Sequence, residues 1–78
     1  MSKKFLTFEL DKKGETVEIH GNSEGLTSLL KGLQNLLYEG KQDHLHLMTP
    51  SWGGEELTEE KQGENNKLIN GVKIFFWK

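Results

Sequence analysis

The chain has 78 residues and a net charge of −2, and its 10 cationic residues are all lysines. This length predicts one domain over residues 1–78, which buries only roughly 60% of its unfolded surface. Arginine is preferred for bidentate contacts with phosphate and guanine, so its absence argues against a nucleic-acid binder. The sequence has no cysteine, no signal-peptide run and no apolar stretch long enough to span a membrane. We therefore expect a soluble, cytoplasmic protein.

Two alternating segments near the start predict a β-hairpin. Residues 5–10 and residues 16–20 each place apolar side chains at every second position, which is the period of a strand with one buried face. Residues 11–14, Asp-Lys-Lys-Gly, end in a glycine where a tight turn favours a left-handed backbone. The side chains that we expect to enter the core are Leu6, Phe8, Leu10, Val17 and Ile19.

A helix is predicted after the hairpin. Asn22 or Ser23 can cap its first turn, and Gly40 suits the position just past its end. Gly25 and Gly32 each weaken an isolated helix by about 1 kcal/mol relative to alanine, so we infer that the helix approaches the sheet closely there. Leucines recur at helical spacing and predict a buried stripe. The stripe that we expect in the core consists of Leu26, Leu29, Leu30, Leu33, Leu36 and Leu37.

The second half of the chain predicts further strands around a long connection. Residues 43–48 alternate again, with two leucines on one face and histidines on the other. The connection over residues 49–66 is longer than most, which is typical of functional or disordered loops. Residues 67–77 predict a last apolar strand. Asn70-Gly71 can instead form a bulge or a tight turn and separate a short strand from the rest.

These elements predict an α+β fold in the order β-β-α-β-β, with a single four-stranded, mostly antiparallel sheet and one helix packed on one face. If the second and third strands are parallel neighbours, the helical crossover between them should be right-handed. The opposite face is too apolar to be merely solvated, so either the long loop folds over it through Trp52 and Leu57 or another protein covers it. The expected members of that face are Phe5, Thr7, Glu18, His20, His44, His46, Met48, Phe75 and Trp77.

Three histidines on this expected face are candidate metal ligands. His44 and His46 are two residues apart on one strand, so both rings can reach one ion, and His20 ends another strand on the same face. Zinc accepts three imidazoles and a water molecule. However, histidines on a half-exposed sheet are more often hydrogen-bonded or stacked on aromatic rings. We therefore predict no metal and no cofactor, and a small metal- or ligand-binding domain is the alternative.

The long loop carries further candidates for partner contact. Trp52 lies between a serine and two glycines, where it can lock the loop onto the sheet or anchor an interface. Ser51 lacks the G-x-S-x-G context of a hydrolase nucleophile. An acid–base pair needs two carboxyl groups with different pKa values, and nothing in the sequence sets the pKa values of the loop glutamates apart. We therefore predict that the protein is not an enzyme. The glutamates form an acidic patch that can attract a basic partner. They are Glu55, Glu56, Glu59, Glu60 and Glu64.

Residues 20–26, 43–57, 59–64 and 68–74 carry the most distinctive motifs of the chain. The most specific is His-Leu-Met-Thr-Pro-Ser-Trp-Gly-Gly over residues 46–54. Together these segments resemble the small immunity proteins of bacterial polymorphic toxin systems, in the family numbered thirty-two. The resemblance implies a cytoplasmic α+β protein that neutralises a cognate toxin by binding it. It assigns no catalytic residue to any position of this sequence.

The resemblance and the residue pattern lead to one prediction about partners. We expect a cognate toxin protein to be bound, with no role for nucleic acid or a membrane. A structural homodimer, formed through the open sheet face, is a further alternative. The predicted contact residues for the toxin are His44, His46, Trp52, Glu55, Glu56, Glu59 and Glu60.

Overall fold

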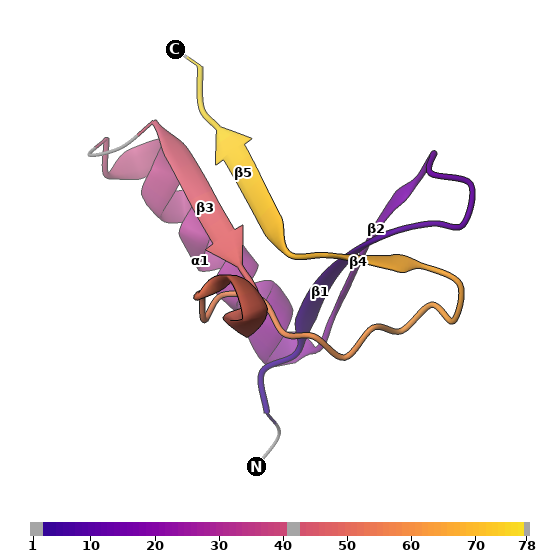
Figure 1. Cartoon of the computed structure of the whole chain (residues 1–78). Coiled ribbons are helices and arrows are strands. Elements are labelled where there is room, and N and C mark those ends of the chain that lie inside the picture. The colour runs from indigo at the N-terminus through magenta and orange to yellow at the C-terminus, as the bar shows by residue number, and fades with distance from the viewer. Residues whose placement is uncertain (1–2, 41–42, 78) are drawn as a thin grey trace.

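The computed structural model describes residues 3–40 and 43–77 (Figure 1). Every strand pair in it is antiparallel. The predicted α+β class, with one α-helix and antiparallel strands, is therefore confirmed. No helix within the described ranges has the length and apolar character needed to cross a membrane. In chain order the elements are β1 (Leu6–Leu10), β2 (Val17–Gly21), α1 (Ser23–Tyr38), β3 (His44–Met48), the 3₁₀ turn η1 (Pro50–Trp52), β4 (Lys67–Ile69) and β5 (Gly71–Phe75).

The strands form two sheets, so our prediction of a single four-stranded sheet is wrong. β2, β1 and β4 form one sheet in that spatial order, and β3 pairs with β5 in the other. The last apolar segment changes sheets at Asn70. There the backbone N–H of Thr49 donates to the Asn70 carbonyl (3.0 Å), and the Thr49 hydroxyl donates to the Asn70 side-chain oxygen (2.7 Å). The alternative of a short separate strand is thus correct. The crossover rule for parallel neighbours does not apply, because β2 and β3 lie in different sheets.

The predicted cap and the close approach of α1 are confirmed. Asn22 Oδ1 accepts hydrogen bonds from the backbone N–H of Gly25 (2.9 Å) and of Phe5 (3.0 Å), which ties the start of the helix to the start of β1. A Cβ on Gly25 would collide with the Phe5 carbonyl oxygen, and one on Gly32 would lie 3.0 Å from Leu45 Cδ2. The helix therefore faces the rest of the fold with a glycine edge.

Only part of the leucine stripe lies in the core, which corrects our prediction. Leu36 is buried, and Leu29 and Leu33 are half-buried. The edge that contains Gly25 and Gly32 lies against the neighbouring strands, so one flank of the leucine stripe turns away from them. The leucines left exposed are Leu26 (47%), Leu30 (54%) and Leu37 (49%).

The core forms where both sheets, α1 and the long connection meet. Its buried members are Leu6 and Phe8 of β1, Leu47 of β3 and Leu57 of the connection. The presence of Leu57 shows that the connection is part of the folded body, because its side chain is only 1% exposed. The half-buried side chains packed against this cluster are Leu29, Leu45, Ile69, Val72 and Ile74.

The outer half of β2 is exposed, contrary to our prediction. Val17 and Ile19 are 55% and 49% exposed, although they share a face with Leu10 and Phe8, their cross-strand neighbours. The helix meets β2 at Gly21, where an added Cβ would lie 3.1 Å from the Leu26 side chain. The rest of β2 extends beyond the helix, as Figure 1 shows. Its apolar side chains therefore have no helix above them.

The other face of β1 is covered by the long connection. Thr7 and Glu9 are both 0% exposed, so the central strand of this sheet is buried on both faces. Thr58 lies beside β1: its N–H donates to the Leu6 carbonyl (2.8 Å), and its hydroxyl oxygen accepts from the Leu6 N–H (3.0 Å). For this half of the fold the loop does fold over the opposite face, but through Gln62, Gly63 and Asn66 and not through Trp52, which is exposed.

Candidate partner-binding site

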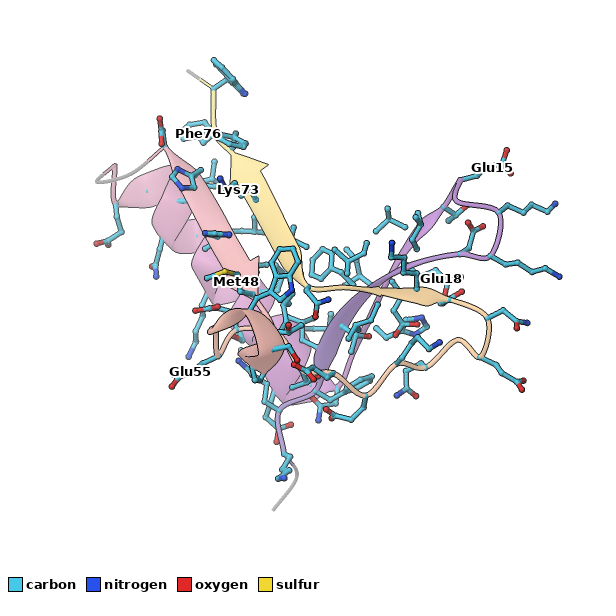
Figure 2. All side chains as sticks on the ribbon, viewed as in Figure 1. Glu15, Glu18, Met48, Glu55, Lys73 and Phe76 are labelled. Atoms are coloured by element: carbon cyan, nitrogen blue, oxygen red, sulfur yellow. The ribbon has the colours of Figure 1, made fainter. Side chains whose placement is uncertain are left out.

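The outward surface of the β3–β5 pair stays accessible (Figure 2). Cross-strand neighbours in a sheet lie on one face, and the register pairs His44 with Phe75, His46 with Lys73 and Met48 with Gly71. The intervening leucines of β3 point to the other side and join the core. The outward surface also includes the tryptophan of η1. We define the open face as His44, His46, Met48, Trp52, Lys73 and Phe75.

The histidines of the open face lie beside other planar groups. The His44 ring stacks on the Phe75 ring, with centroids 5.4 Å apart and an interplanar angle of 29°. His44 Nδ1 donates to Asp43 Oδ1 (3.0 Å), and this hydrogen bond lowers the pKa of Asp43 below its ordinary value. The His46 ring lies 6.5 Å from the His44 ring. This row of rings offers stacking surface and hydrogen-bonding nitrogens to a partner.

Trp52 extends the open face beyond the end of β3. Gly53 follows it with φ +88°, a left-handed conformation that favours glycine, and turns the chain back. The indole lies against Gly71, where an added Cβ would be 3.0 Å from Cζ3. Even so, 61% of Trp52 is exposed. The ring therefore rests on β5 by one edge and presents most of its surface to solvent.

A surface pocket of about 290 Å³ adjoins Trp52 where β4 passes into β5. This volume is at the lower limit of roughly 300 Å³ that is usual for small-molecule sites, so a side chain from a partner protein fits it better than a drug-sized ligand does. Side chains that anchor interfaces commonly fill such pockets. The lining residues are Leu10, Trp52, Lys67, Leu68, Ile69, Asn70 and Gly71.

Backbone hydrogen bonds hold the loop that carries Trp52. The carbonyl of Thr49, a residue that is 0% exposed, accepts the N–H groups of Trp52 and Gly54, both at 2.9 Å. The N–H of buried Leu57 donates to the Met48 carbonyl (3.1 Å). A partner that binds this loop does not have to order it first, which lowers the entropic cost of association.

Two of the predicted contact glutamates also hold this loop in shape. Glu56 Oε1 accepts a hydrogen bond from the Met48 N–H (3.0 Å), and Glu59 Oε2 accepts one from the Ser51 N–H (2.7 Å). Burial raises the pKa of Glu56, but hydrogen bonds from backbone N–H groups lower it further, so the net shift is downward. The hydrogen bonds from Ser51 lower the pKa of Glu59. Both carboxylates are therefore ionised acceptors at neutral pH.

Glu55 and Glu60 are exposed, as Glu59 is, but their carboxylates accept no hydrogen bond from Met48 or Ser51. The main-chain carbonyl of Glu55 accepts a hydrogen bond from Lys4 Nζ (3.0 Å). Glu60 Oε1 accepts from the Glu59 N–H at 3.2 Å, on the surface. These two carboxylates add negative charge to the loop that carries Trp52, where they can act on a partner at a distance.

The polar side chains on the covered face of β1 and β2 form a closed hydrogen-bond network around Glu9. Glu9 Oε2 accepts from Thr7 Oγ1 (2.6 Å) and the Gln62 N–H (2.9 Å). Glu9 Oε1 accepts from the Gly63 N–H (3.0 Å) and Asn66 Nδ2 (2.9 Å). Burial raises the pKa of this carboxyl, but these four hydrogen bonds lower it further, to about 2. Glu9 is thus an ionised carboxylate that holds the loop against the sheet.

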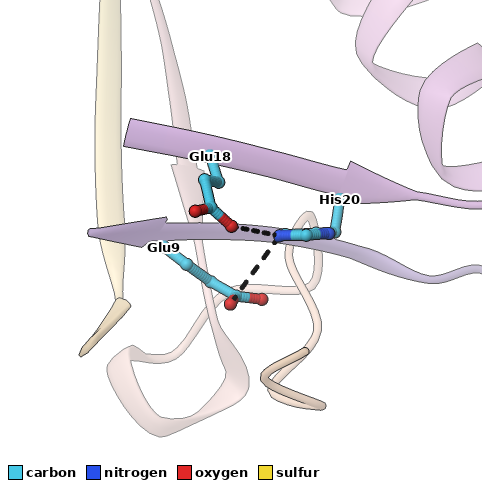
Figure 3. A group of neighbouring side chains, drawn as sticks. All are labelled: Glu9, Glu18 and His20. Atoms are coloured by element: carbon cyan, nitrogen blue, oxygen red, sulfur yellow. Dashed lines mark hydrogen bonds and ion pairs between the residues drawn. The ribbon is translucent and has the colours of Figure 1, made fainter. Parts of the chain in front are cut away.

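His20 belongs to the Glu9 network and not to the open face (Figure 3). Its Nε2 lies 2.8 Å from Glu18 Oε1 and 3.9 Å from Glu9 Oε1. Among the described residues, Glu9, Glu18 and His20 are the one group of three potential ligands with atoms within 4.8 Å of one another. The oxygens of Glu9 already accept four hydrogen bonds, so this cluster has the chemistry of a structural clamp. The three histidines named as candidate ligands do not come together, because His44 and His46 lie in the other sheet.

Sequence reasoning missed the role of Glu9. Strand alternation puts Glu9 on the same side of β1 as Thr7, but its acceptor role depends on donors 53, 54 and 57 residues away. The one local hint is Thr7, which is two residues earlier on the same face and donates to Glu9. The pocket beside Trp52 was missed for a similar reason: it exists because β4 and β5 belong to different sheets.

Comparison with known proteins links this chain to one family. A family model described as immunity protein 32 matches residues 16–72. The match spans β2, α1, β3, the long connection and β4, and it contains every contact residue that we predicted. No curated protein and no solved structure matches the chain.

Proposed function

The chain belongs to the immunity protein 32 family, and we propose that it protects a bacterial cell by binding a toxin protein in the cytoplasm without catalysing a reaction. The proposed contact surface is the open face together with the loop glutamates. One observation carries this proposal: Trp52 is 61% exposed although backbone hydrogen bonds fix the loop around it. An exposed tryptophan on a pre-ordered loop is typical of residues that dominate the free energy of protein–protein binding.

The shape and chemistry of the open face support a protein partner. The pocket next to Trp52 has space for one inserted side chain. His46 and Phe75 are exposed, and Lys73 lies opposite His46 in the register, so aromatic, imidazole and ammonium groups alternate along the surface. Interfaces between separately folded proteins combine aromatic side chains with polar groups in this way. Such a surface blocks a toxin by occupying it and needs no chemistry of its own.

The loop glutamates divide between two roles. Glu55 and Glu60 are exposed and accelerate the encounter with a basic toxin surface, an effect that salt screens over about 8 Å at physiological ionic strength. Glu56 and Glu59 accept backbone hydrogen bonds from Met48 and Ser51, so their main role is to hold the loop that carries Trp52 in its conformation.

The test is co-expression with the toxin domain encoded beside this gene, scored as growth of the host. Trp52→Ala and His46→Ala should lose protection while their far-ultraviolet circular dichroism spectra remain those of the native protein. Tyr38→Ala is the matched control, because Tyr38 is an 80% exposed aromatic residue on α1, away from the open face. It should protect as well as the native chain does.

One combined variant decides whether the surface is correctly placed. It carries Trp52→Ala together with glutamine at Glu55, Glu56, Glu59 and Glu60. Full protection by this variant, if it is folded, would show that the toxin contacts another part of the molecule.

A further inference from the structure

A second exposed surface lies on α1 and β2, two elements that carry no part of the open face. It consists only of aliphatic side chains, each about half exposed. We define the apolar strip as Val17 (55%), Ile19 (49%), Leu26 (47%), Leu30 (54%) and Leu37 (49%).

The apolar strip is continuous along two elements. Ile19 lies two residues before Gly21 on the same face of β2, and Gly21 packs against the side chain of Leu26. Leu30 and Leu37 then follow Leu26 on one flank of the helix, at spacings of four and seven residues. Figure 1 shows β2 and α1 meeting near the start of the helix and diverging from there. The strip thus runs along β2 and along α1 from the point where the two elements meet.

The chain exposes more surface than a compact monomer of its mass. Five aliphatic side chains at half exposure present roughly 450 Å² of apolar surface, and apolar patches of roughly 300–600 Å² on monomers are often functional. The total accessible surface is 5709 Å², whereas a monomer of 8.9 kDa exposes about 4,800 Å². The surplus is about 900 Å², and one partner in a standard interface buries about 800 Å².

The radius of gyration agrees with this surplus. It is 13.0 Å for the Cα atoms, compared with about 11.5 Å for a compact domain of this length. The chain is therefore more open than its size requires, and the divergence of β2 from α1 contributes to that openness.

The composition of the strip favours a second copy of this chain over the toxin as its occupant. The open face carries imidazole and ammonium groups beside acidic residues, which suits a partner that also exists alone in water. The apolar strip carries only valine, isoleucine and leucine, and homodimer interfaces are more apolar than those between separately folded partners. A second copy of the chain is present whenever the chain is made, so it can serve as a permanent partner. The net charge of −2 gives little repulsion between two copies.

We infer that two copies of this chain pack their apolar strips together about a two-fold axis. The same patch then lies on both sides of the interface, as two-fold symmetry requires. This places a homodimer on α1 and β2 and leaves the open face of each copy free, so the dimer presents two separate toxin-binding surfaces. The inference stands independently of the proposed function.

The test is sedimentation equilibrium of the full chain over a range of concentrations. The native protein should have twice the monomer mass of 8.9 kDa. Leu30→Glu should raise the dimer dissociation constant by at least about 30-fold, as expected for an interface hot spot. Asn35→Glu is the matched control: it adds the same charge to an exposed position of the same helix outside the strip, and it should leave the dimer intact.

A second variant tests the β2 arm without altering the helix. Ile19→Lys places a charge at a half-exposed position on the β2 arm of the strip and should also give the monomer, with a circular dichroism spectrum like that of the native chain. Trp52→Ala should remain a dimer. A native chain that is monomeric at about 100 μM would overturn the inference, since homodimers of standard interface size dissociate well below that concentration.

Two further outcomes separate this inference from the proposed function. If Trp52→Ala dissociates the dimer while Leu30→Glu does not, the copies meet through the open face and the inference is wrong. If the native chain is monomeric and Leu30→Glu abolishes protection in the co-expression assay, the apolar strip is the toxin site, which also overturns the inference. A monomeric Leu30→Glu variant that still protects supports both assignments.

Discussion

The two sheets both carry polar residues on the face opposite the shared core, but these residues end in contrasting environments. In the β2-β1-β4 sheet, Thr7 and Glu9 are 0% exposed beneath the long connection. In the β3–β5 sheet, His46 and Lys73 remain exposed. The comparison teaches that alternation along a strand separates two faces, whereas the path of a loop decides which of them solvent or a partner can reach.

The loop covers the first sheet because Glu9 provides acceptors for it. A loop that lies against a sheet brings backbone N–H groups out of water, and each needs a partner. Glu9 accepts the N–H groups of Gln62 and Gly63 and the side-chain amide of Asn66. The start of the same connection, beside the second sheet, forms hydrogen bonds within itself instead: the N–H groups of Trp52 and Gly54 donate to the Thr49 carbonyl. The Trp52 side chain stays exposed there.

Removing Glu9 should have the largest effect of these changes, because it should release the long connection from the β2-β1-β4 sheet that it covers. Glu9→Ala leaves several buried donors without an acceptor, so the free energy of unfolding should fall by about 3–5 kcal/mol, a large share of the total for a small domain. His46→Ala on the open face is the control and should change it by less than about 0.5 kcal/mol. Urea titrations followed by circular dichroism measure both. A loss below about 1 kcal/mol for Glu9→Ala would contradict the role of this network.

The same carboxylate should make stability depend on pH in the acid range. The pKa of Glu9 falls from its ordinary 4.5 to about 2 in the folded protein. Between these values the unfolded chain binds more protons than the folded one, so the contribution of Glu9 is present above about pH 4.5 and is lost as pH falls through about 2. The urea midpoint measured from pH 7 to pH 2 should drop in this window. Glu9→Gln should show a flatter profile, and an unchanged profile would contradict the assignment.

Replacing Trp52 tests the accessible face of the β3–β5 sheet, because the change should affect toxin binding more than folding. The ring is 61% exposed, so Trp52→Ala should lower the free energy of unfolding by less than about 1 kcal/mol. The dissociation rate from the toxin should rise by an amount that matches about 2 kcal/mol or more. Thermal melts and surface plasmon resonance on the same variant separate these effects. A large loss of thermal stability with unchanged toxin binding would identify Trp52 as a loop lock.

Neutralising glutamates in pairs should give the smallest effects and should distinguish their two roles. Glu55→Gln with Glu60→Gln should slow association with the toxin several-fold and flatten its dependence on salt, because rim charges act mainly on encounter. Glu56→Gln with Glu59→Gln should instead lower the melting temperature, because these carboxylates accept the backbone hydrogen bonds of Met48 and Ser51 in the loop that carries Trp52. Equal effects of the two pairs on association would contradict this division.

An outer pair of glutamates controls for net charge in these kinetic measurements. Glu15 and Glu39 are exposed and lie outside the loop that carries Trp52. Their replacement by glutamine changes the net charge by the same amount as the Glu55 and Glu60 replacements do. If this pair slows association equally, the steering field comes from the whole protein and not from the loop.

Prediction from sequence succeeded where the signal is local. The Asn22 cap and the alternation of β3 each depend on residues that are near one another in the chain, and both are present. Prediction was wrong where a residue's surroundings come from distant parts of the chain. Ile19 and Leu30 carry the correct periodicity for burial, yet they lie where no described element covers them.

By itself, the sequence determined the strands, the helix with its cap, the accessible histidines of β3 and the family to which the chain belongs. Only the tertiary structure decided the division into two sheets, the burial of Glu9 and the exposure of half the leucine stripe. The physical reason is that these features arise from contacts between distant segments. Donors more than 50 residues away hold Glu9, and the glycine edge of α1 packs against Phe5 and Leu45, which sets the direction of its leucines. Periodicity along the chain contains neither kind of information.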